Sequence, residues 1–392
     1  MRKRIGVGVI GLGWMGQTHS RSLRRIPMHF PDRGFDPALV VCSDAVPARA
    51  EAARDSFGFI EQAGDWRAVA DHPDVDLVVV TAPNALHLEI IEATTAAGKD
   101  ILCEKPVGGT PEQTARAEAL ARKAGVVTGV GYNYRFAPLV QHTKHLIDSG
   151  ALGDITSYRG RFFSMYGNDP LGRLSWRFQL EEGGHGVSTD LLSHSVDLAH
   201  MMIGAIDRVV ATKATFIADR PLAAAGEGTH YDRGAPGDPT GPVTNEDYVG
   251  MLCTFASGAR GSFESSRTFV GPESQMAFEI FGTRGSVAWN LETMNELRVY
   301  LADDDPSSGY RTVYGGERFP YHGHFVPGNA NAIGFEDLIV IEDYELCRAI
   351  TERHAHHPGF DDALAYVSVQ DALLRSCESE RWEPVTSLRE EG

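Results

Sequence analysis

The chain has 392 residues, of which 42% are hydrophobic and 23% are charged, a composition typical of soluble globular proteins. This length is too great for one ordinary hydrophobic core, so we expect two domains. The formal net charge of −17 argues against nucleic acid and anionic membranes as partners, because both need a basic surface.

Five cysteines are scattered along the chain, with no C-x-x-C pair. An odd and sparse set in a large chain is typical of reduced thiols, so we expect a cytoplasmic protein. The basic residues at 2–4 and the apolar run Ile5–Ile10 superficially resemble a signal peptide. The run is short and passes directly into a glycine-rich turn, so we interpret it as a first β-strand. No stretch is apolar and long enough to span a bilayer.

The first half alternates short apolar runs with amphipathic stretches, which predicts a parallel sheet with crossover helices. The near-continuous Val and Leu character of the runs fits strands that are buried on both faces. The expected strands are Ile5–Ile10, Leu39–Cys42, Leu77–Val80, Ile101–Cys103 and Val126–Val130, and the expected helices include His87–Ala97 and Pro111–Ala124.

A glycine fingerprint follows the first strand and opens a helix, which is the context in which G-x-G-x-x-G predicts dinucleotide binding. The glycines allow a tight turn and a close approach of the backbone to a pyrophosphate at the helix N-terminus. The fingerprint consists of Gly11, Leu12, Gly13, Trp14, Met15 and Gly16.

Asp44 follows the second strand and is placed to accept hydrogen bonds from the adenosine ribose. A carboxylate there would repel a 2′-phosphate, so we expect NAD as the cofactor. Arg49 lies close by and could tolerate a phosphate, which leaves NADP as the less favoured alternative.

Glu104-Lys105-Pro106 closes the apolar run Ile101–Cys103. Lysine carries three donors on a flexible chain, so Lys105 can contact a substrate hydroxyl and the cofactor ribose together. The X-Pro bond that follows it can be cis, which would turn the end of the strand sharply. A lysine delivered by a later strand of the same sheet predicts a nicotinamide-dependent oxidoreductase.

After about Gly150 the pattern changes to short strands joined by Gly or Ser turns, which predicts an antiparallel sheet. We therefore divide the chain into an NAD-binding Rossmann domain, residues 1–135, and an α/β substrate-binding and oligomerisation domain, residues 136–392. Two long loops, Arg220–Pro242 and Asp303–Asn331, are typical of lids, oligomer contacts or disorder. The expected strands are Val209–Ile217, Val249–Phe255, Arg260–Thr268, Met276–Gly282 and Gly285–Asn290, and the tail stretches Ile333–Glu352 and Asp361–Ser376 are expected helices that pack on either domain.

A glycine-rich turn, Gly183–Gly186, leads into a stretch that is predicted to be helical. Asp190, His194 and Asp197 occur at i, i+4 and i+7, so they share one helix face. Oxidation of an alcohol needs a base for the hydroxyl proton, and histidine titrates in the suitable range. Asp190 would orient the imidazole or bind a neighbouring substrate hydroxyl; a buried structural Asp–His pair is the alternative.

In this order, the motifs resemble the glucose–fructose oxidoreductase, inositol dehydrogenase and rhizopine-catabolism (Gfo/Idh/MocA) family. The resemblance implies an α/β Rossmann domain followed by an α+β domain with an open-faced, mostly antiparallel sheet that often serves oligomerisation, and hence a homodimer or homotetramer. The residues that carry the resemblance are Gly11–Gly16, Thr81, Ala82, Pro83 and Asn84 with His87, Glu104-Lys105-Pro106, Tyr132-Asn133-Tyr134-Arg135, and Asp190, His194 and Asp197.

The same resemblance implies a catalytic group of Lys105, Asp190 and His194 that acts on a sugar or cyclitol hydroxyl. It places Asn84, His87 and Glu104 at the nicotinamide end of the cofactor. The expected cofactor-binding residues are the fingerprint, Asp44, Arg49, Thr81, Ala82, Pro83, Asn84, His87, Glu104, Lys105 and Asn133.

Within the family, Leu174–Phe178 and the C-terminal half look closest to sugar 3-dehydrogenases of the levoglucosan dehydrogenase type. Trp176 offers an apolar face on which sugars commonly stack, and Arg177 or Arg161 could donate to hydroxyls, although each could equally be a packing or surface residue. The expected substrate-binding residues are Lys105, Tyr134, Arg135, Arg161, Trp176, Arg177, Asp190, His194 and, if the second long loop acts as a lid, His324.

Three functions remain compatible with these residues, and an NAD-dependent dehydrogenase of a sugar, glucoside, anhydrosugar or cyclitol, oxidised at C3, is favoured. The second is a glycoside hydrolase or lyase that holds NAD and uses a transient 3-keto intermediate. The third is a non-catalytic NAD-sensing regulator, which would be expected to lose Lys105 or His194. We expect no metal site, because the histidines of His354–His357 lack clear ligand spacing.

Overall fold

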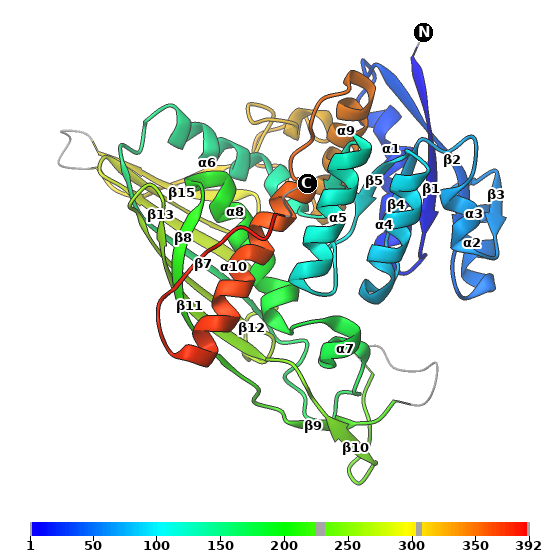
Figure 1. Ribbon diagram of the computed structural model, residues 1–392. Helices are drawn as coiled ribbons and strands as arrows, with labels where there is room; N and C mark the ends of the chain where they lie inside the picture. Colours follow the sequence, from blue (N-terminus) through cyan, green and yellow to red (C-terminus); the bar gives the residue numbers. More distant parts are fainter. Residues whose placement is uncertain (1, 224–231, 303–307, 390–392) are drawn as a thin grey trace.

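The N-terminal half forms an entirely parallel sheet with the strand order β3-β2-β1-β4-β5-β6 (Figure 1). The computed structural model describes residues 2–223, 232–302 and 308–389, so residues 224–231 and 303–307 of the two expected loops lie outside the described residues. The strand order reverses beside β1, which is where open parallel sheets bind dinucleotides at the carboxyl ends of their strands. The strands are β1 (Lys3–Ile10), β2 (Phe35–Ser43), β3 (Glu61–Ala63), β4 (Leu77–Val80), β5 (Asp100–Cys103) and β6 (Thr128–Val130).

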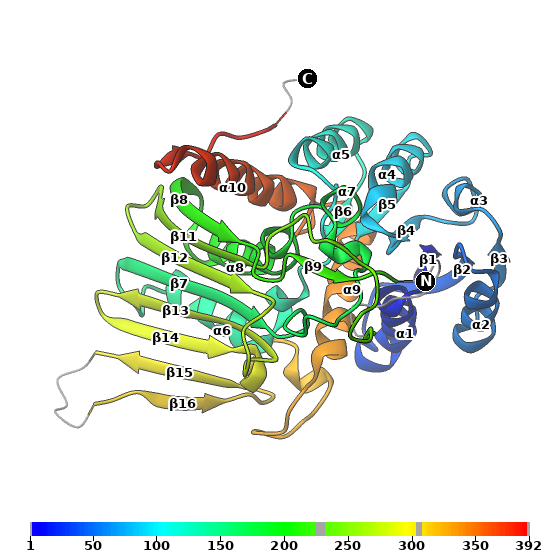
Figure 2. The same cartoon turned by 90° about the horizontal axis from the view of Figure 1, so that it is seen from below.

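Helices cover both faces of this sheet, as the near-continuous apolar strands predict (Figure 2). Helix α5 shows how the local sequence sets its limits: the Thr110 side chain accepts a hydrogen bond from the N–H of Gln113, Pro111 occupies the first turn, and Gly125 ends the helix in a left-handed conformation. The helices and short 3₁₀ turns are α1 (Trp14–His29), α2 (Pro47–Phe57), α3 (Trp66–Ala70), η1 (Asn84–Leu86), α4 (His87–Ala96), α5 (Pro111–Ala124) and η2 (Asn133–Phe136).

The second sheet has the strand order β16-β15-β14-β13-β7-β12-β11-β8-β17 and is antiparallel except for the pair β7–β12. The predicted open-faced, mostly antiparallel sheet is therefore confirmed. A short hairpin of β9 and β10 stands apart from it. The strands are β7 (Ile155–Ser164), β8 (Ile206–Ala214), β9 (Asp219–Pro221), β10 (Thr240–Pro242), β11 (Tyr248–Phe255), β12 (Arg260–Ser266), β13 (Ser274–Gly282), β14 (Gly285–Asn290), β15 (Glu296–Leu301), β16 (Arg311–Tyr314) and β17 (Glu383–Pro384).

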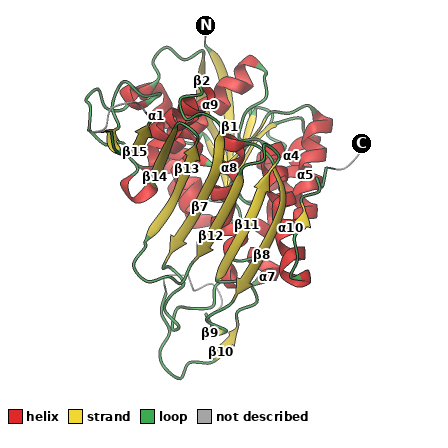
Figure 3. Ribbon diagram, turned by 90° about the vertical axis from the view of Figure 1, so that its left-hand side faces the viewer, coloured by secondary structure: helices red, strands yellow, loops and turns green. Residues whose placement is uncertain are grey.

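One face of the second sheet packs against helices and the other is open (Figure 3). Strand β11 shows the alternation, since Val249, Met251 and Cys253 are buried whereas Leu252 is exposed. The remaining helices and turns are α6 (Pro138–Asp148), η3 (Trp176–Phe178), α7 (Leu180–Gly183), η4 (Ser188–Leu192), α8 (Ser193–Ile203), η5 (Leu291–Thr293), η6 (His322–His324), α9 (Phe335–Glu352) and α10 (Phe360–Ser379). None of the helices in the described residues could cross a membrane.

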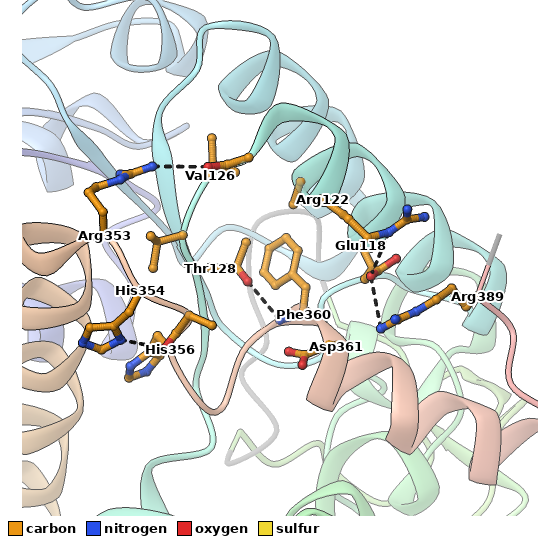
Figure 4. A pocket seen from close by; sticks show the side chains of 14 residues that line it. Glu118, Arg122, Val126, Thr128, Arg353, His354, His356, Phe360, Asp361 and Arg389 are labelled. Atoms are coloured by element: carbon orange, nitrogen blue, oxygen red, sulfur yellow. Dashed lines mark hydrogen bonds and ion pairs between the residues drawn. The ribbon is translucent and has the colours of Figure 1, made fainter. Parts of the chain in front are cut away.

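The two tail helices connect the domains. Helix α9 returns to the first domain, where Ile341 and Leu346 share a core with Ile5 of β1 and Leu23 of α1. Helix α10 contacts both α5 and the second sheet at β8. A cavity of about 410 Å³ lies between the C-terminal part of α5 and the segment that joins α9 to α10 (Figure 4).

Candidate active site

The glycine fingerprint forms a tight turn between β1 and α1. Gly11 has a φ of 90°, and a Cβ there would lie 2.6 Å from the carbonyl oxygen of Thr81. A Cβ on Gly16 would lie 1.9 Å from the carbonyl oxygen of Gly11, whereas Gly13 faces open space. No side chain caps the start of α1, so its first N–H groups and positive dipole end remain available to a pyrophosphate. This cradle fits the predicted dinucleotide.

Asp44 lies at the end of β2, directly beside the fingerprint. Its carboxylate accepts hydrogen bonds from the N–H of Leu12 at 2.7 Å and from the N–H of Val46 at 2.8 Å. Each oxygen keeps a further lone pair that could accept from a ribose hydroxyl. Arg49 is largely exposed, 3.9 Å from Asp44. The negative charge at this position fits NAD better than NADP.

The segment from Thr81 to His87 supports the fingerprint and reaches the second domain. The Thr81 hydroxyl donates to the carbonyl oxygen of Gly11 at 2.5 Å, and the Asn84 amide donates to the carbonyl oxygen of Gly183 at 3.3 Å. Both ring nitrogens of the buried His87 lie within 2.8 Å of the carbonyl oxygens of Ala82 and Pro106. His87 therefore stabilises the backbone around the site. Although His87 is predicted to contact the cofactor, both of its ring nitrogens lie against backbone carbonyls.

Lys105 and Asp190 bring the two domains together at the candidate site. The Lys105 ammonium donates to the Asp190 carboxylate at 2.6 Å and to the Asp190 carbonyl oxygen at 2.9 Å. The Lys105–Pro106 peptide bond is cis. The lysine is thus held at the carboxyl end of β5, where the order of the parallel sheet places a bound dinucleotide.

Two further side chains contact Asp190 from the second domain. The Tyr166 hydroxyl donates to its second oxygen at 2.9 Å, and Arg177 lies 3.5 Å from the same oxygen. Burial alone would raise the pKa of Asp190, but Lys105 and then Arg177 outweigh it and hold the pKa well below its usual range. Asp190 therefore remains a carboxylate, and Lys105 stays fixed beside it.

His194 lies on α8 within a shell of aromatic rings. Its ring centroid is 4.8 Å from that of Tyr134, 5.6 Å from that of Tyr132 and 6.0 Å from that of Phe162. Burial lowers the pKa of His194 well below 6.5, Lys105 lowers it further, and Asp190 opposes them. His194 is therefore a neutral imidazole at neutral pH and can accept a proton. Tyr134, a predicted substrate-binding residue, packs against the His194 ring.

The predicted regular helix from Asp190 to Asp197 begins with a wider, π-helical turn, η4. Gln370 on α10 donates to the hydroxyls of Ser188 and Thr189 at 3.1 and 2.9 Å, which fixes this turn. Asp190 faces Lys105, and the hydrogen bonds of the described residues do not join it directly to His194. Of the two roles expected for Asp190, contact with a substrate hydroxyl therefore needs no rearrangement of its side chain.

Arg135 is predicted to bind the substrate, but its side chain is engaged by two carboxylates. Its guanidinium donates to the Asp197 carboxylate at 2.8 and 2.6 Å and to Asp362 at 2.9 Å. Burial raises the pKa of Asp197 to about 6, although Arg135 opposes this shift. These three residues form a structural cluster between η2, α8 and α10. Asp197, which shares the predicted helix face with Asp190 and His194, therefore stabilises the fold.

Two other predicted substrate contacts lie elsewhere. Arg161 follows the alternation of β7, so it points to the open face of the sheet while Phe162 points to His194; its Nε donates to Gln275 at 3.4 Å. His324 lies beyond the C-terminal end of α1, with its ring 4.5 Å from Phe30. Neither residue contacts Asp190. The alternation of β7 turns Arg161 to the open face of the sheet, and the second loop carries His324 to the end of α1.

Trp176 and Arg177 lie together on η3, beside Asp190. The Arg177 guanidinium is 4.5 Å from the centroid of the Trp176 ring, and Trp176 is 37% exposed. Their contact with a substrate stays a prediction. Asn133 is also buried, and its amide nitrogen has no hydrogen-bond partner in the described part of the chain.

A buried network of residues that the sequence did not indicate fixes η3. The Arg267 guanidinium forms an ion pair with Asp247 at 2.7 Å and donates to the carbonyl oxygen of Arg177 at 3.2 Å. Asn245 donates to the same carbonyl at 3.0 Å and to that of Gly184 at 2.9 Å. Arg220 and Arg267 lie 4.0 and 4.5 Å from the centroid of the Phe178 ring. Arg177 is therefore held from behind by a rigid clamp, consisting of Arg267, Asp247 and Asn245.

Comparison with known proteins matches both halves of the chain. Residues 5–132 match the family described as "Oxidoreductase family, NAD-binding Rossmann fold", and residues 140–288 match the "GFO/IDH/MocA C-terminal domain". Levoglucosan dehydrogenase from Pseudarthrobacter phenanthrenivorans is 37% identical over 98% of this chain and 99% of its own length. Inositol 2-dehydrogenase from Rhizobium meliloti is 26% identical over 95% of this chain and 97% of its own length.

Solved structures give the same relationship. Levoglucosan dehydrogenase in its apo form superposes with a TM-score of 0.94 at 36% identity, covering 98% of this chain and all of the other. Its complex with NADH and levoglucosan gives a TM-score of 0.92 with the same coverage. An NAD-binding oxidoreductase from Klebsiella pneumoniae, 34% identical, gives a TM-score of 0.90 over 98% of this chain and 99% of that one. The chain belongs to the Gfo/Idh/MocA family of NAD-binding oxidoreductases.

Proposed function

We propose that the protein is an NAD-dependent dehydrogenase that oxidises a ring hydroxyl, at C3, of an anhydrosugar or glucoside. The observation that carries this proposal is the likeness to levoglucosan dehydrogenase along nearly the whole of both chains. The Lys105–Asp190 pair and the neutral His194 supply the polar groups that oxidation of an alcohol needs. Trp176 and Arg177 supply an apolar face and hydrogen-bond donors of the kind that suit a sugar ring.

The roles of the residues follow from their chemistry. Lys105, fixed by Asp190, donates a hydrogen bond to the reacting hydroxyl and stabilises the negative charge that develops on its oxygen. His194 accepts the hydroxyl proton, and the C–O bond becomes a carbonyl as the carbon loses a hydride. Bound NAD⁺ supplies the hydride acceptor. The fingerprint turn and Asp44 would hold its pyrophosphate and ribose.

A panel of sugars tests this function. The purified protein with NAD⁺ is offered levoglucosan, glucose, alkyl and aryl glucosides, and inositols, and NADH absorbance is followed. We expect absorbance to rise with levoglucosan or glucosides and NMR of the product to show a 3-keto group. No net NADH with any sugar, although NAD⁺ binds, would move the assignment to a hydrolase or lyase with a closed redox cycle, or to a sensor. Oxidation at another carbon would contradict the C3 assignment.

The pH dependence of oxidation tests the role of His194. Because burial and Lys105 lower its pKa below 6.5, the imidazole stays unprotonated, and therefore competent as a base, as the pH falls through the ordinary histidine range. We expect the acidic limb of kcat/KM to have its midpoint below pH 6.5, measured from initial rates with saturating NAD⁺. A midpoint above 6.5 would show that another group, or an exposed histidine, limits the reaction.

We also propose that the open face of the second sheet forms a homo-oligomer interface. Leu252 is 53% exposed on this face, which the helices leave open (Figure 3), and the family resemblance implies a sheet that often serves oligomerisation. We expect sedimentation velocity to show a dimer or tetramer, and Leu252→Glu to shift it toward monomer. Ile60→Glu, at an even more exposed apolar position (69%) on the first domain, is the control. A wild-type monomer would contradict the proposal.

A further inference from the structure

A buried cluster of ionisable side chains joins α1 of the first domain to the tail helix α9. His19 contributes from α1, and Glu342 and Asp343 contribute from α9, and all of them are almost completely inaccessible to water. One ligand atom from each of the three residues lies within 4.8 Å of the others. His19 and Asp343 are 324 positions apart in the chain, which is why no spacing pattern reveals the cluster.

Three of the four carboxylate oxygens in this cluster lack a partner, and the fourth, Oδ1 of Asp343, faces the His19 ring. Both oxygens of Glu342 and the Oδ2 atom of Asp343 have no hydrogen-bond partner in the described part of the chain. Among the same residues, neither carboxylate forms an ion pair with a lysine or an arginine. Buried carboxylates without compensation are strongly unfavourable, so such groups indicate that an ion, a water molecule or a proton completes the site.

The surroundings of His19 favour an ion. Its Nδ1 atom lies 2.9 Å from the Asp343 carboxylate, while its Nε2 atom lies 3.3 Å from the Glu104 carboxylate. A metal-bound histidine usually donates its other ring N–H to a carboxylate, which fixes the tautomer and the ring orientation. His19 can take this arrangement, with Nε2–H donating to Glu104 and Nδ1 facing the Asp343 carboxylate.

Glu342 has no neighbour within hydrogen-bond distance with which to share a proton. Without an ion, its carboxyl group would have to be buried in the neutral form with no hydrogen-bond partner, which is unfavourable. A metal ion bridges atoms that are further apart, because each metal–ligand bond is about 2.0–2.2 Å long for imidazole nitrogen and carboxylate oxygen. One nitrogen and two carboxylate oxygens suit a divalent ion such as Zn²⁺ or Mn²⁺, whereas Mg²⁺ and Ca²⁺ prefer oxygen ligands alone.

We propose that His19, Glu342 and Asp343 bind a divalent transition-metal ion that fastens α9 to α1. The site is structural, because its three ligands are closed to solvent. It connects to that group through one residue: the Oε1 atom of Glu104 faces His19, and its Oε2 atom accepts a hydrogen bond from the backbone N–H of Lys105 at 3.2 Å. The ion would thus stabilise the chain segment that carries Lys105.

Metal analysis of the whole protein tests the proposal. The tag-free protein, purified without chelators from medium supplemented with Zn²⁺, Mn²⁺, Fe²⁺ and Co²⁺, is measured by inductively coupled plasma mass spectrometry. We expect about one ion per chain, and a fall of several degrees in Tm when a strong chelator removes it, because a ligand that binds only the folded state stabilises that state. Protein loaded with Co²⁺ is expected to show visible d–d absorption. Protein without stoichiometric metal, whose Tm does not respond to any of these ions, would overturn the proposal.

Glu342→Gln makes the test more specific, because a bound ion and an unpaired carboxyl group predict different changes in Tm for this variant. If the ion is present, losing a ligand lowers both metal content and Tm. If Glu342 is only a buried, unpaired carboxyl group, the neutral isosteric side chain leaves Tm unchanged or raises it. Glu336→Gln is the control on the same helix, since Glu336 is half-exposed and pairs with Arg21. His357→Ala removes the exposed group His357–Asp361–Asp362, and loss of the ion in that variant would place the metal there instead.

Discussion

Lys105→Met is expected to lower kcat/KM for sugar oxidation by about 10³- to 10⁴-fold, within the range for loss of a positioned proton-handling or charge-stabilising group. The ammonium is the donor that Asp190 holds in place at 2.6 Å, and methionine keeps the length of the side chain without its charge. Asp190 keeps Tyr166 and Arg177 as partners, so the fold is expected to survive. Initial rates, with circular dichroism and an NAD⁺ titration on the same samples, measure the change.

The control for that variant is Lys144→Met, which removes a lysine from the surface of α6, where it pairs with Asp148. Its rate is expected to match that of the unmodified protein. Lys105→Arg retains the charge but not the compact ammonium, so we expect it to recover only a small part of the activity. A Lys105→Met protein that retains more than about a tenth of the activity would remove Lys105 from the reaction.

The sequence predicts the fold well where periodicity is strong. The strand Leu77–Val80 and the helix Pro111–Ala124 lie where the apolar pattern and the capping residues place them. The central strand β7 escapes prediction, although it holds the second sheet together between β12 and β13. Its exposed face carries Arg159 and Arg161, so the segment does not have the apolar character of the other strands.

The sequence predicts those residues of the candidate site that lie in local motifs, but not their partners from distant segments. Lys105 and Asp190 belong to recognisable local motifs, and the structure brings them together. Tyr166 lies just beyond the unpredicted strand β7, so nothing in its neighbourhood marks it as a partner of Asp190. Arg135 has the right residue type and lies in a family motif, but its carboxylate partners come from two distant helices. Pairing between distant segments is information that local patterns do not contain.

Arg267→Met is expected to lower the free energy of unfolding by about 3–5 kcal/mol, the usual cost of removing one partner from a buried ion pair. Arg267 and Asp247 have side-chain exposures of 1% and 0%, so the remaining carboxylate cannot recruit water. The loss has a functional part, because the same guanidinium holds the backbone of Arg177. Chemical denaturation followed by circular dichroism measures the first effect, and KM for the sugar measures the second.

A purely structural role would lower stability and leave the kinetics of the surviving folded protein unchanged. We expect instead that KM for the sugar rises more than KM for NAD⁺, because the clamp supports η3 and does not contact the fingerprint. Arg267→Lys keeps the charge next to Asp247 but cannot span Asp247, Asn245 and the Arg177 carbonyl together. It should therefore recover stability further than it recovers KM. Arg161 lies on the open face of the sheet with one long hydrogen bond, so Arg161→Met should change neither the free energy of unfolding nor KM for the sugar. Equal losses in both methionine variants would show that the clamp has no special role in holding Arg177 beside Asp190.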